Sequence, residues 1–222
     1  MRRKPLLRSE SIDQSTLGVI LVSTITRPNP MIVPSPGDLY HFTVGQYDQM
    51  VRDRTIGEDE PVELLNGVVV WKMPRGPKHV TSTKACQRAL RNLVAAGWHV
   101  AKEDPVRIPD YDEPEPDIAV IRGDDTAYAN HHPGPADISL IIEVADATLT
   151  RDRTVKLQTY ALAGVPIYWI VNLIDGQVEV YSDPDPGAGS YKARVDYVRG
   201  QDVPVVIDGQ EVGGIPVADL LL

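Results

Sequence analysis

The stretch Ser139–Ala145 (SLIIEVA) decides the fold, because it is a short apolar run that carries a single carboxylate, Glu143. Its apolar residues are continuous, which is typical of a strand buried on both faces in the middle of a sheet. A bare carboxylate there costs several kcal/mol unless it is paired, hydrogen-bonded or bound to a metal ion. This cost favours a functional Glu143 over the two alternatives, an exposed strand end or a pair with a core arginine.

The segments on either side of this strand predict a layered fold. Asp117–Ile121 (DIAVI) precedes it as a second strand, and a helix over 151–163 follows it. Gly164 ends that helix, and 167–171 (IYWIV) forms the next strand. This order predicts an α/β or α+β fold with a mixed β-sheet flanked by helices.

A turn signal near the start of the chain adds a β-hairpin. Residues 61–71 (PVELLNGVVVW) contain two β-rich runs around Asn66-Gly67, the preferred pair for a two-residue type I′ turn. This turn sets Glu63 opposite Val70. Glu63 is therefore predicted to lie inside a strand.

The other predicted elements follow from capping, periodicity and turn residues. They are helices over 44–54 and 78–96, the latter closed by Gly97; strands at 98–101 and 106–108; a hairpin from 177–181 and 191–198 with a loop at 183–189; and a turn at Asp208-Gly209. Residues 1–37 are predicted to be an N-terminal extension and 38–182 the main domain. Residues 183–222 are predicted to be a C-terminal hairpin and tail that pack on this domain.

The composition limits the classes of function. The chain of 222 residues carries 22 basic and 31 acidic residues, a net charge of −9, which argues against broad non-specific binding to nucleic acid. Carboxylates clustered at a divalent-cation site would lower the charge in the same way. One cysteine, Cys86, excludes an intrachain disulfide and any CxxC motif. The single cysteine suits a reducing cytoplasm, so a cytoplasmic protein is predicted. The apolar run Leu17–Ile25 is too short to span a membrane, so no membrane partner is predicted, and the acidic residues before it and the prolines after it disfavour a secretory signal.

Asp117 opens the strand before Glu143. Taken alone, it is explained equally well as an aspartate at a strand edge in an acidic loop. Carboxylates that meet on neighbouring strands supply the oxygen ligands that Mg²⁺ prefers, and waters and a substrate phosphate complete its coordination. Such an ion lowers the pKa of a bound water and stabilises charge on a phosphoryl group.

Lys156 lies on the helix after Glu143 and shares one face with Asp152 and Tyr160 at i, i+4 spacing. Without further context, an exposed Asp152–Lys156 pair is the favoured interpretation, with a contribution of a few tenths of a kcal/mol. In the functional interpretation the ammonium points at the metal site. There it orients or deprotonates water and stabilises the transition-state anion.

Several short motifs occur in a distinctive order. They are Pro116-Asp117, Ile142-Glu143-Val144, Asp152-x₃-Lys156-x₃-Tyr160 and Gly164-Val165-Pro166-x-Tyr168-Trp169-Ile170-Val171. Together they resemble the Uma-two family of restriction endonucleases, within the PD-(D/E)XK nuclease superfamily. The segment 63–67 (ELLNG) resembles the opening hairpin of that family, and His79 falls where the family has a histidine before its first long helix.

The resemblance implies a restriction-endonuclease-like fold, a four-stranded mixed sheet flanked by helices, and phosphodiester hydrolysis that depends on Mg²⁺, with Mn²⁺ as a substitute. It implies Asp117 and Glu143 as metal ligands, Lys156 as the catalytic lysine and Glu63 as an accessory carboxylate. For His79, a histidine that faces solvent at the start of a helix is the preferred interpretation.

One position departs from the superfamily pattern, in which the lysine follows the acid by two residues. That position is Ala145 here, so Lys156 must reach the site from the helix. The first hypothesis is a Mg²⁺-dependent endonuclease that acts on DNA, for which a homodimer would supply two sites. The alternative is a catalytically inactive protein that keeps the nuclease fold as a regulatory or partner-binding module, which Ala145 and the net charge favour. A third possibility is metal-assisted hydrolysis of another phosphoester by the same residues.

Overall fold

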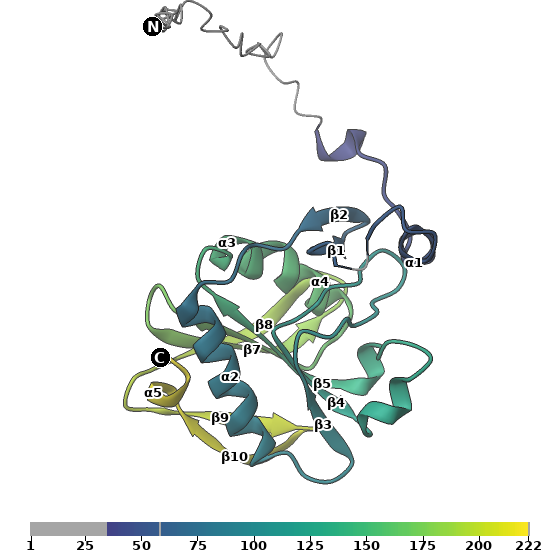
Figure 1. Ribbon diagram of the computed structural model, residues 1–222. Helices are drawn as coiled ribbons and strands as arrows, with labels where there is room; N and C mark the ends of the chain where they lie inside the picture. Colours follow the sequence, from purple (N-terminus) through teal and green to yellow (C-terminus); the bar gives the residue numbers. More distant parts are fainter. Residues whose placement is uncertain (1–34, 58, 222) are drawn as a thin grey trace, which may run out of the picture. The chain divides into compact units, whose positions relative to one another are not determined.

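The computed structural model describes residues 35–57 and 59–221 (Figure 1). The chain divides into two units, residues 1–37 and 38–222. The predicted extension lies outside the described residues except for 35–37, and so does its apolar run Leu17–Ile25. Among the described helices, none is long and apolar enough to cross a membrane.

The centre of the second unit is a six-stranded mixed sheet in the order β3-β4-β5-β6-β7-β8. Its β5 and β6 are parallel, and every other neighbouring pair is antiparallel. The strands are β3 (Trp98–Ala101), β4 (Ile118–Arg122), β5 (Ile138–Ala145), β6 (Ile167–Asn172), β7 (Gln177–Asp185) and β8 (Ser190–Val198). The predicted α/β class with a mixed sheet is confirmed. The expected count of four strands is wrong, because the hairpin β7–β8 pairs with β6 and extends the sheet.

Every residue of β5 is buried, as the continuous apolar run predicted. Parallel strands need a crossover connection, and a helical segment supplies it between β5 and β6. It consists of α3 (Leu149–Arg151), the π-helical segment η4 (Asp152–Lys156) and α4 (Leu157–Leu162). Single π-helical turns occur frequently at functional sites.

The two faces of the sheet carry different layers (Figure 1). On one face, α2 (Pro77–Arg91), the hairpin of β9 (Asp202–Ile207) and β10 (Gln210–Pro216), and α5 (Val217–Leu220) bury an apolar cluster. On the other face, α4 packs Tyr160 against Ile141, Tyr168 and Ile170. This second face also carries Glu143, because side chains alternate between faces along β5.

The hairpin of β1 (Val62–Leu65) and β2 (Val68–Trp71) lies outside the large sheet. Its turn has positive φ at Asn66 and Gly67, 48° and 71°, as the type I′ prediction requires. The predicted register, Glu63 opposite Val70, is confirmed. A Cβ at Gly67 would stand 2.7 Å from Cβ of His41, so the close approach also requires glycine.

The remaining elements complete the second unit. They are α1 (Val44–Arg52), capped by Thr43 and Gln46, and the 3₁₀ turns η2 (Asp125–Tyr128) and η3 (Pro135–Asp137); a further turn, η1 (Pro36–Asp38), spans the boundary of the units.

Some predicted boundaries are wrong. Helix α2 ends at Arg91 rather than near residue 96, because Leu93 and Val94 turn to pack against the apolar cluster. The predicted strand at 106–108 reduces to one isolated bridge between Ile108 and Asp112. Part of the loop predicted at 183–189 belongs to β7, which continues to Asp185.

Candidate active site

Two neighbouring strands bring Asp117 and Glu143 together. Ile118 pairs with Ile142 across the antiparallel pair β4–β5, so the preceding Asp117 lies opposite Glu143. Both side chains are buried, with exposures of 5% and 4%. Oδ2 of Asp117 accepts a hydrogen bond of 2.8 Å from the backbone N–H of Val144. The sheet register therefore creates the pair of strand-borne carboxylates that the sequence predicted.

Lys156 reaches this pair from the helical segment although Ala145 occupies the usual lysine position. Its Nζ donates to Oε1 of Glu143 at 2.9 Å. Oη of Tyr160, one turn later, donates to the same oxygen at 2.8 Å. The exposed Asp152–Lys156 pair, favoured from spacing alone, is wrong because both side chains are buried against the sheet.

Glu63 of β1 closes the site from the hairpin side. Its Oε2 lies 3.3 Å from Nζ of Lys156 and accepts a hydrogen bond of 3.2 Å from the backbone N–H of Glu115. Nη1 of Arg151 lies 3.7 Å from the other oxygen and also donates to the carbonyl of Trp71. The hairpin, the loop before β4 and the helical segment therefore meet at one carboxylate.

His79 was predicted to face solvent, and this prediction is wrong. The side chain is 8% exposed, and its Nε2 lies 3.1 Å from Oδ2 of Asp117. Its Nδ1 lies 3.4 Å from Oγ1 of Thr83. The first turn of α2 approaches the N-terminal end of β4, so a residue at the start of the helix is buried by tertiary packing.

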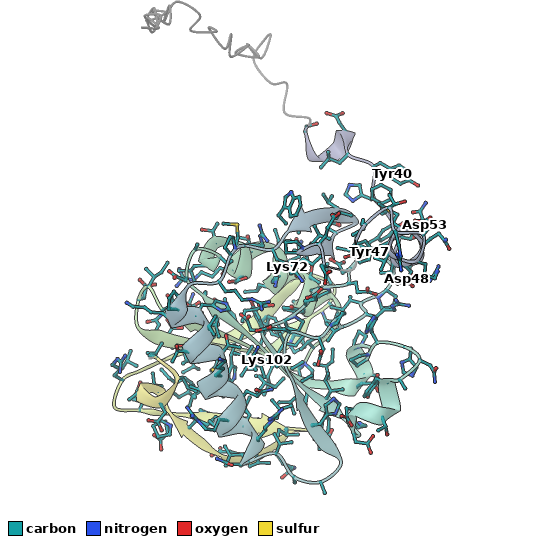
Figure 2. The ribbon with its side chains drawn as sticks, viewed as in Figure 1. Tyr40, Tyr47, Asp48, Asp53, Lys72 and Lys102 are labelled. Atoms are coloured by element: carbon teal, nitrogen blue, oxygen red, sulfur yellow. The ribbon has the colours of Figure 1, made fainter. Side chains whose placement is uncertain are left out.

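The loop that leads to Asp117 is held by α1. The guanidinium of Arg107 lies 2.8 Å from both Asp48 and Glu113. Figure 2 labels Asp48 beside Tyr47 on α1. Burial first, and then nearby carboxylates that include Glu113, raise the pKa of Tyr47 to about 12. This anchor fixes the loop before the candidate site from outside the large sheet.

The electrostatics of the buried carboxyls reflect their crowding. Burial raises the pKa of Glu143 to about 8, although the ammonium of Lys156 opposes the rise. Burial alone would lower the pKa of Lys156, but Glu143, Glu63 and Asp152 outweigh burial and raise it. Lys156 therefore keeps its proton, and the site holds more buried carboxyl groups than buried ammonium groups.

These side chains line one cavity of about 70 Å³. Three further cations line it as well, Lys72, Arg75 and Arg151. Lys72 is labelled in Figure 2, and its Nζ lies 2.5 Å from Glu115. Within residues 35–57 and 59–221, no three His, Cys, Asp or Glu side chains already stand together as a metal-binding set.

Another buried carboxylate, Glu179 of β7, was not singled out in the sequence. It is fully buried and accepts hydrogen bonds from Arg153 of η4, Asn172 and Tyr181. The signal was present, because Glu179 interrupts the run VEVY as Glu143 interrupts its own strand. The contact with Arg153 fixes the π-helical segment to the sheet.

Replacing Glu179 with glutamine is expected to lower the free energy of unfolding by about 2–3 kcal/mol at pH 7. Burial raises the pKa of Glu179, but the hydrogen bonds from Arg153 and its other partners hold it at about 2. Because the pKa of Glu179 in the folded protein lies below the ordinary value of 4.5, its charge stabilises the fold at pH values above 4.5. This stability is lost as the pH falls from 4.5 towards 2. The partly exposed arginines reduce the effect.

Urea denaturation at pH 7, 5 and 3.5 measures this difference, with Glu211→Gln on β10 as an exposed control. We expect the difference between wild type and Glu179→Gln to shrink between pH 5 and 3.5. A loss of stability that is equal at all three values would assign the effect to packing rather than to charge.

Comparisons with known proteins give the family and the fold of the chain. A family model described as "Uma2: Putative restriction endonuclease" matches residues 44–211. Among solved structures, the chain is similar to a "putative nuclease belonging to DUF820" from Anabaena variabilis ATCC 29413, with a TM-score of 0.61 and 18% identity over 81% of this chain and 97% of that chain. At this identity the likeness shows the fold alone. The search of curated proteins gave no match. The family match covers most of the sequence, so the chain belongs to the Uma2 family.

Proposed function

We propose that this protein is a Mg²⁺-dependent endonuclease that hydrolyses phosphodiester bonds in DNA by attack of a metal-activated water. The observation that carries the proposal is the meeting of Asp117, Glu143, Glu63 and Lys156 in one cavity, from separate parts of the sequence. Membership of the Uma2 family supports nuclease chemistry.

The residues fit a hard divalent cation. The cavity holds buried carboxyl groups in excess over its buried ammonium group. Mg²⁺ commonly uses only one or two carboxylates and takes its other ligands from water and substrate phosphate. Asp117 and Glu143 would hold the ion, which supplies a more acidic bound water and stabilises phosphoryl charge.

The other side chains position these two. His79 and the backbone N–H of Val144 both contact Oδ2 of Asp117 and leave its second oxygen for a ligand. Tyr160 holds Glu143 by a hydrogen bond. Lys156, which keeps its proton, stabilises the negative charge that develops on the phosphoryl oxygens.

A DNA backbone suits the cations that line the cavity. Lys72, Arg75 and Arg151 place positive charge beside the carboxylates although the whole chain is acidic. Each is half-buried, so its charge is screened less than that of a fully exposed side chain. A two-fold dimer would place two such sites on the two strands of a duplex.

The test is plasmid cleavage by purified protein in Mg²⁺ or Mn²⁺, with EDTA and Asp117→Asn as controls. We expect metal-dependent nicking that EDTA stops and Asp117→Asn reduces by about a hundredfold or more. Calorimetry on the same samples measures metal binding. A folded wild type that neither cuts nor binds metal would contradict the nuclease and favour a regulatory module with the same fold.

A further inference from the structure

Asp152 lines the same cavity as Asp117 and Glu143, and no role in the site has been assigned to it so far. It is 2% exposed. Among the described residues, its Oδ2 and Nε1 of Trp169 are the buried side-chain atoms without a hydrogen-bond partner. Trp169 belongs to the apolar cluster on the opposite face of the sheet. Asp152 is therefore a residue of the cavity lining whose Oδ2 is a buried acceptor with no donor among the described residues.

Two other candidate proton acceptors of the cavity, Lys156 and His79, are already engaged. Lys156 donates to Glu143 and contacts Glu63. Both ring nitrogens of His79 have partners, Asp117 and Thr83. A group that receives a proton from an attacking water needs a lone pair that no other donor occupies. Oδ2 of Asp152, a residue that lines the cavity, has one.

The backbone around Asp152 is fixed. Its carbonyl oxygen accepts a hydrogen bond of 3.1 Å from Oη of Tyr168 on β6. The next residue, Arg153, is anchored by Glu179 on β7. The carboxyl group therefore stands on a segment tied to two strands of the sheet, which holds its free oxygen at a defined place.

We propose that Asp152 is a further catalytic residue, the general base that accepts the proton of the attacking water. This inference rests on the proposed function. In the step, the water oxygen bonds to phosphorus, its proton moves to Oδ2 of Asp152, and the bond from phosphorus to the leaving oxygen breaks. The leaving oxygen takes its proton from solvent water, and Asp152 later releases its own to solvent. Burial raises the pKa of Asp152 to about 6, which suits a proton acceptor near neutral pH.

The first test compares wild type, Asp152→Asn and the exposed control Asp219→Asn on α5. We expect Asp152→Asn to lower kcat about a hundredfold, with KM and the calorimetric Kd for Mg²⁺ within about threefold of wild type. Asp219→Asn should leave all three unchanged. Loss of Mg²⁺ affinity by more than about tenfold would make Asp152 a metal ligand and overturn the inference.

Thermal unfolding without metal gives a readout that is independent of activity. Burial raises the pKa of Asp152, so its charged form opposes folding, and Asp152→Asn is expected to have a Tm equal to wild type or above it. A Tm several degrees below wild type would assign Asp152 a structural role instead.

Chemical rescue tests the proton transfer directly. In Asp152→Ala, added formate should restore at least about a tenth of the lost rate, because it supplies a carboxylate in the vacated space. The same formate should not restore Asp117→Asn. Wild-type kcat in Asp152→Asn would overturn this inference alone. Absence of cutting by wild type in any metal would overturn the proposed function as well.

Discussion

Replacement of Glu143 with glutamine is expected to lower the rate of metal-dependent cleavage by about a thousandfold while the protein stays folded. Glutamine keeps an oxygen that can accept the hydrogen bonds from Lys156 and Tyr160. It removes the charge that would hold the cation between β4 and β5. The loss should therefore fall on chemistry and metal affinity rather than on the fold.

The pKa of Glu143 gives this prediction a second measurable part. Burial raises that pKa to about 8, so the folded protein favours the uncharged carboxyl more than the unfolded chain does. The charged form consequently costs stability, and this cost grows as the pH rises from about 4.5 to 8. In metal-free buffer, Glu143→Gln should be at least as stable as wild type at pH 8.

Plasmid cleavage, calorimetry with Mg²⁺ and urea denaturation test the two parts, with Glu211→Gln on β10 as the matched control. Cleavage at the wild-type rate by Glu143→Gln would remove Glu143 from the metal site. A large loss of stability at pH 8 would show instead that the charge of Glu143 supports the fold through Lys156.

Replacement of Lys156 with methionine is expected to have the largest effect on stability, a loss of about 3–5 kcal/mol in metal-free buffer. Methionine keeps the volume of the stem but removes the ammonium between Glu143 and Glu63. Buried carboxylates then lose their nearest opposite charge. Cleavage should fall by about a hundredfold because the charge on the phosphoryl oxygens is no longer stabilised.

Mg²⁺ should partly restore the stability of Lys156→Met, because a bound cation replaces the missing positive charge. The increase in Tm on adding Mg²⁺ should therefore be greater for Lys156→Met than for wild type. Lys72→Met is the matched control, since Lys72 lines the same cavity but is more exposed and pairs with Glu115. Equal metal-induced shifts in all three proteins would contradict a shared role of ammonium and metal.

The sequence predicted those parts of the site that depend on the desolvation cost of one side chain or on the geometry of one turn. Glu143 was found from the desolvation of a carboxylate in an apolar strand. Glu63 was placed in its strand by the Asn66-Gly67 turn, and the register confirmed it. The importance of Lys156 came from the family resemblance, because helical spacing alone favoured an exposed ion pair.

The remaining parts depend on which segments meet in space. His79 and Asp152 are helical residues. His79 is buried by the N-terminal end of β4, and Asp152 is buried by the large sheet. Helical periodicity predicts neither contact. The extension of the sheet from four strands to six follows from the pairing of β7 with β6. Turn residues in the sequence predict the two strands of a hairpin, but they do not predict which strand of the sheet the hairpin pairs with.

The two faces of the sheet also have a consequence for how this chain can change in evolution. The apolar face, with Leu90 of α2, Trp169 and the β9–β10 hairpin, contains none of the proposed catalytic groups. The other side of the sheet carries Glu143 and Asp152, and burial raises the pKa of both, so their charge opposes folding. Substitutions that inactivate Glu143 or Asp152 would therefore relieve strain rather than create it, and nothing in the folding of the chain selects against them. If the chain hydrolyses phosphodiester bonds as proposed, a single substitution would abolish this activity and retain the fold, so only selection for cleavage itself would maintain it.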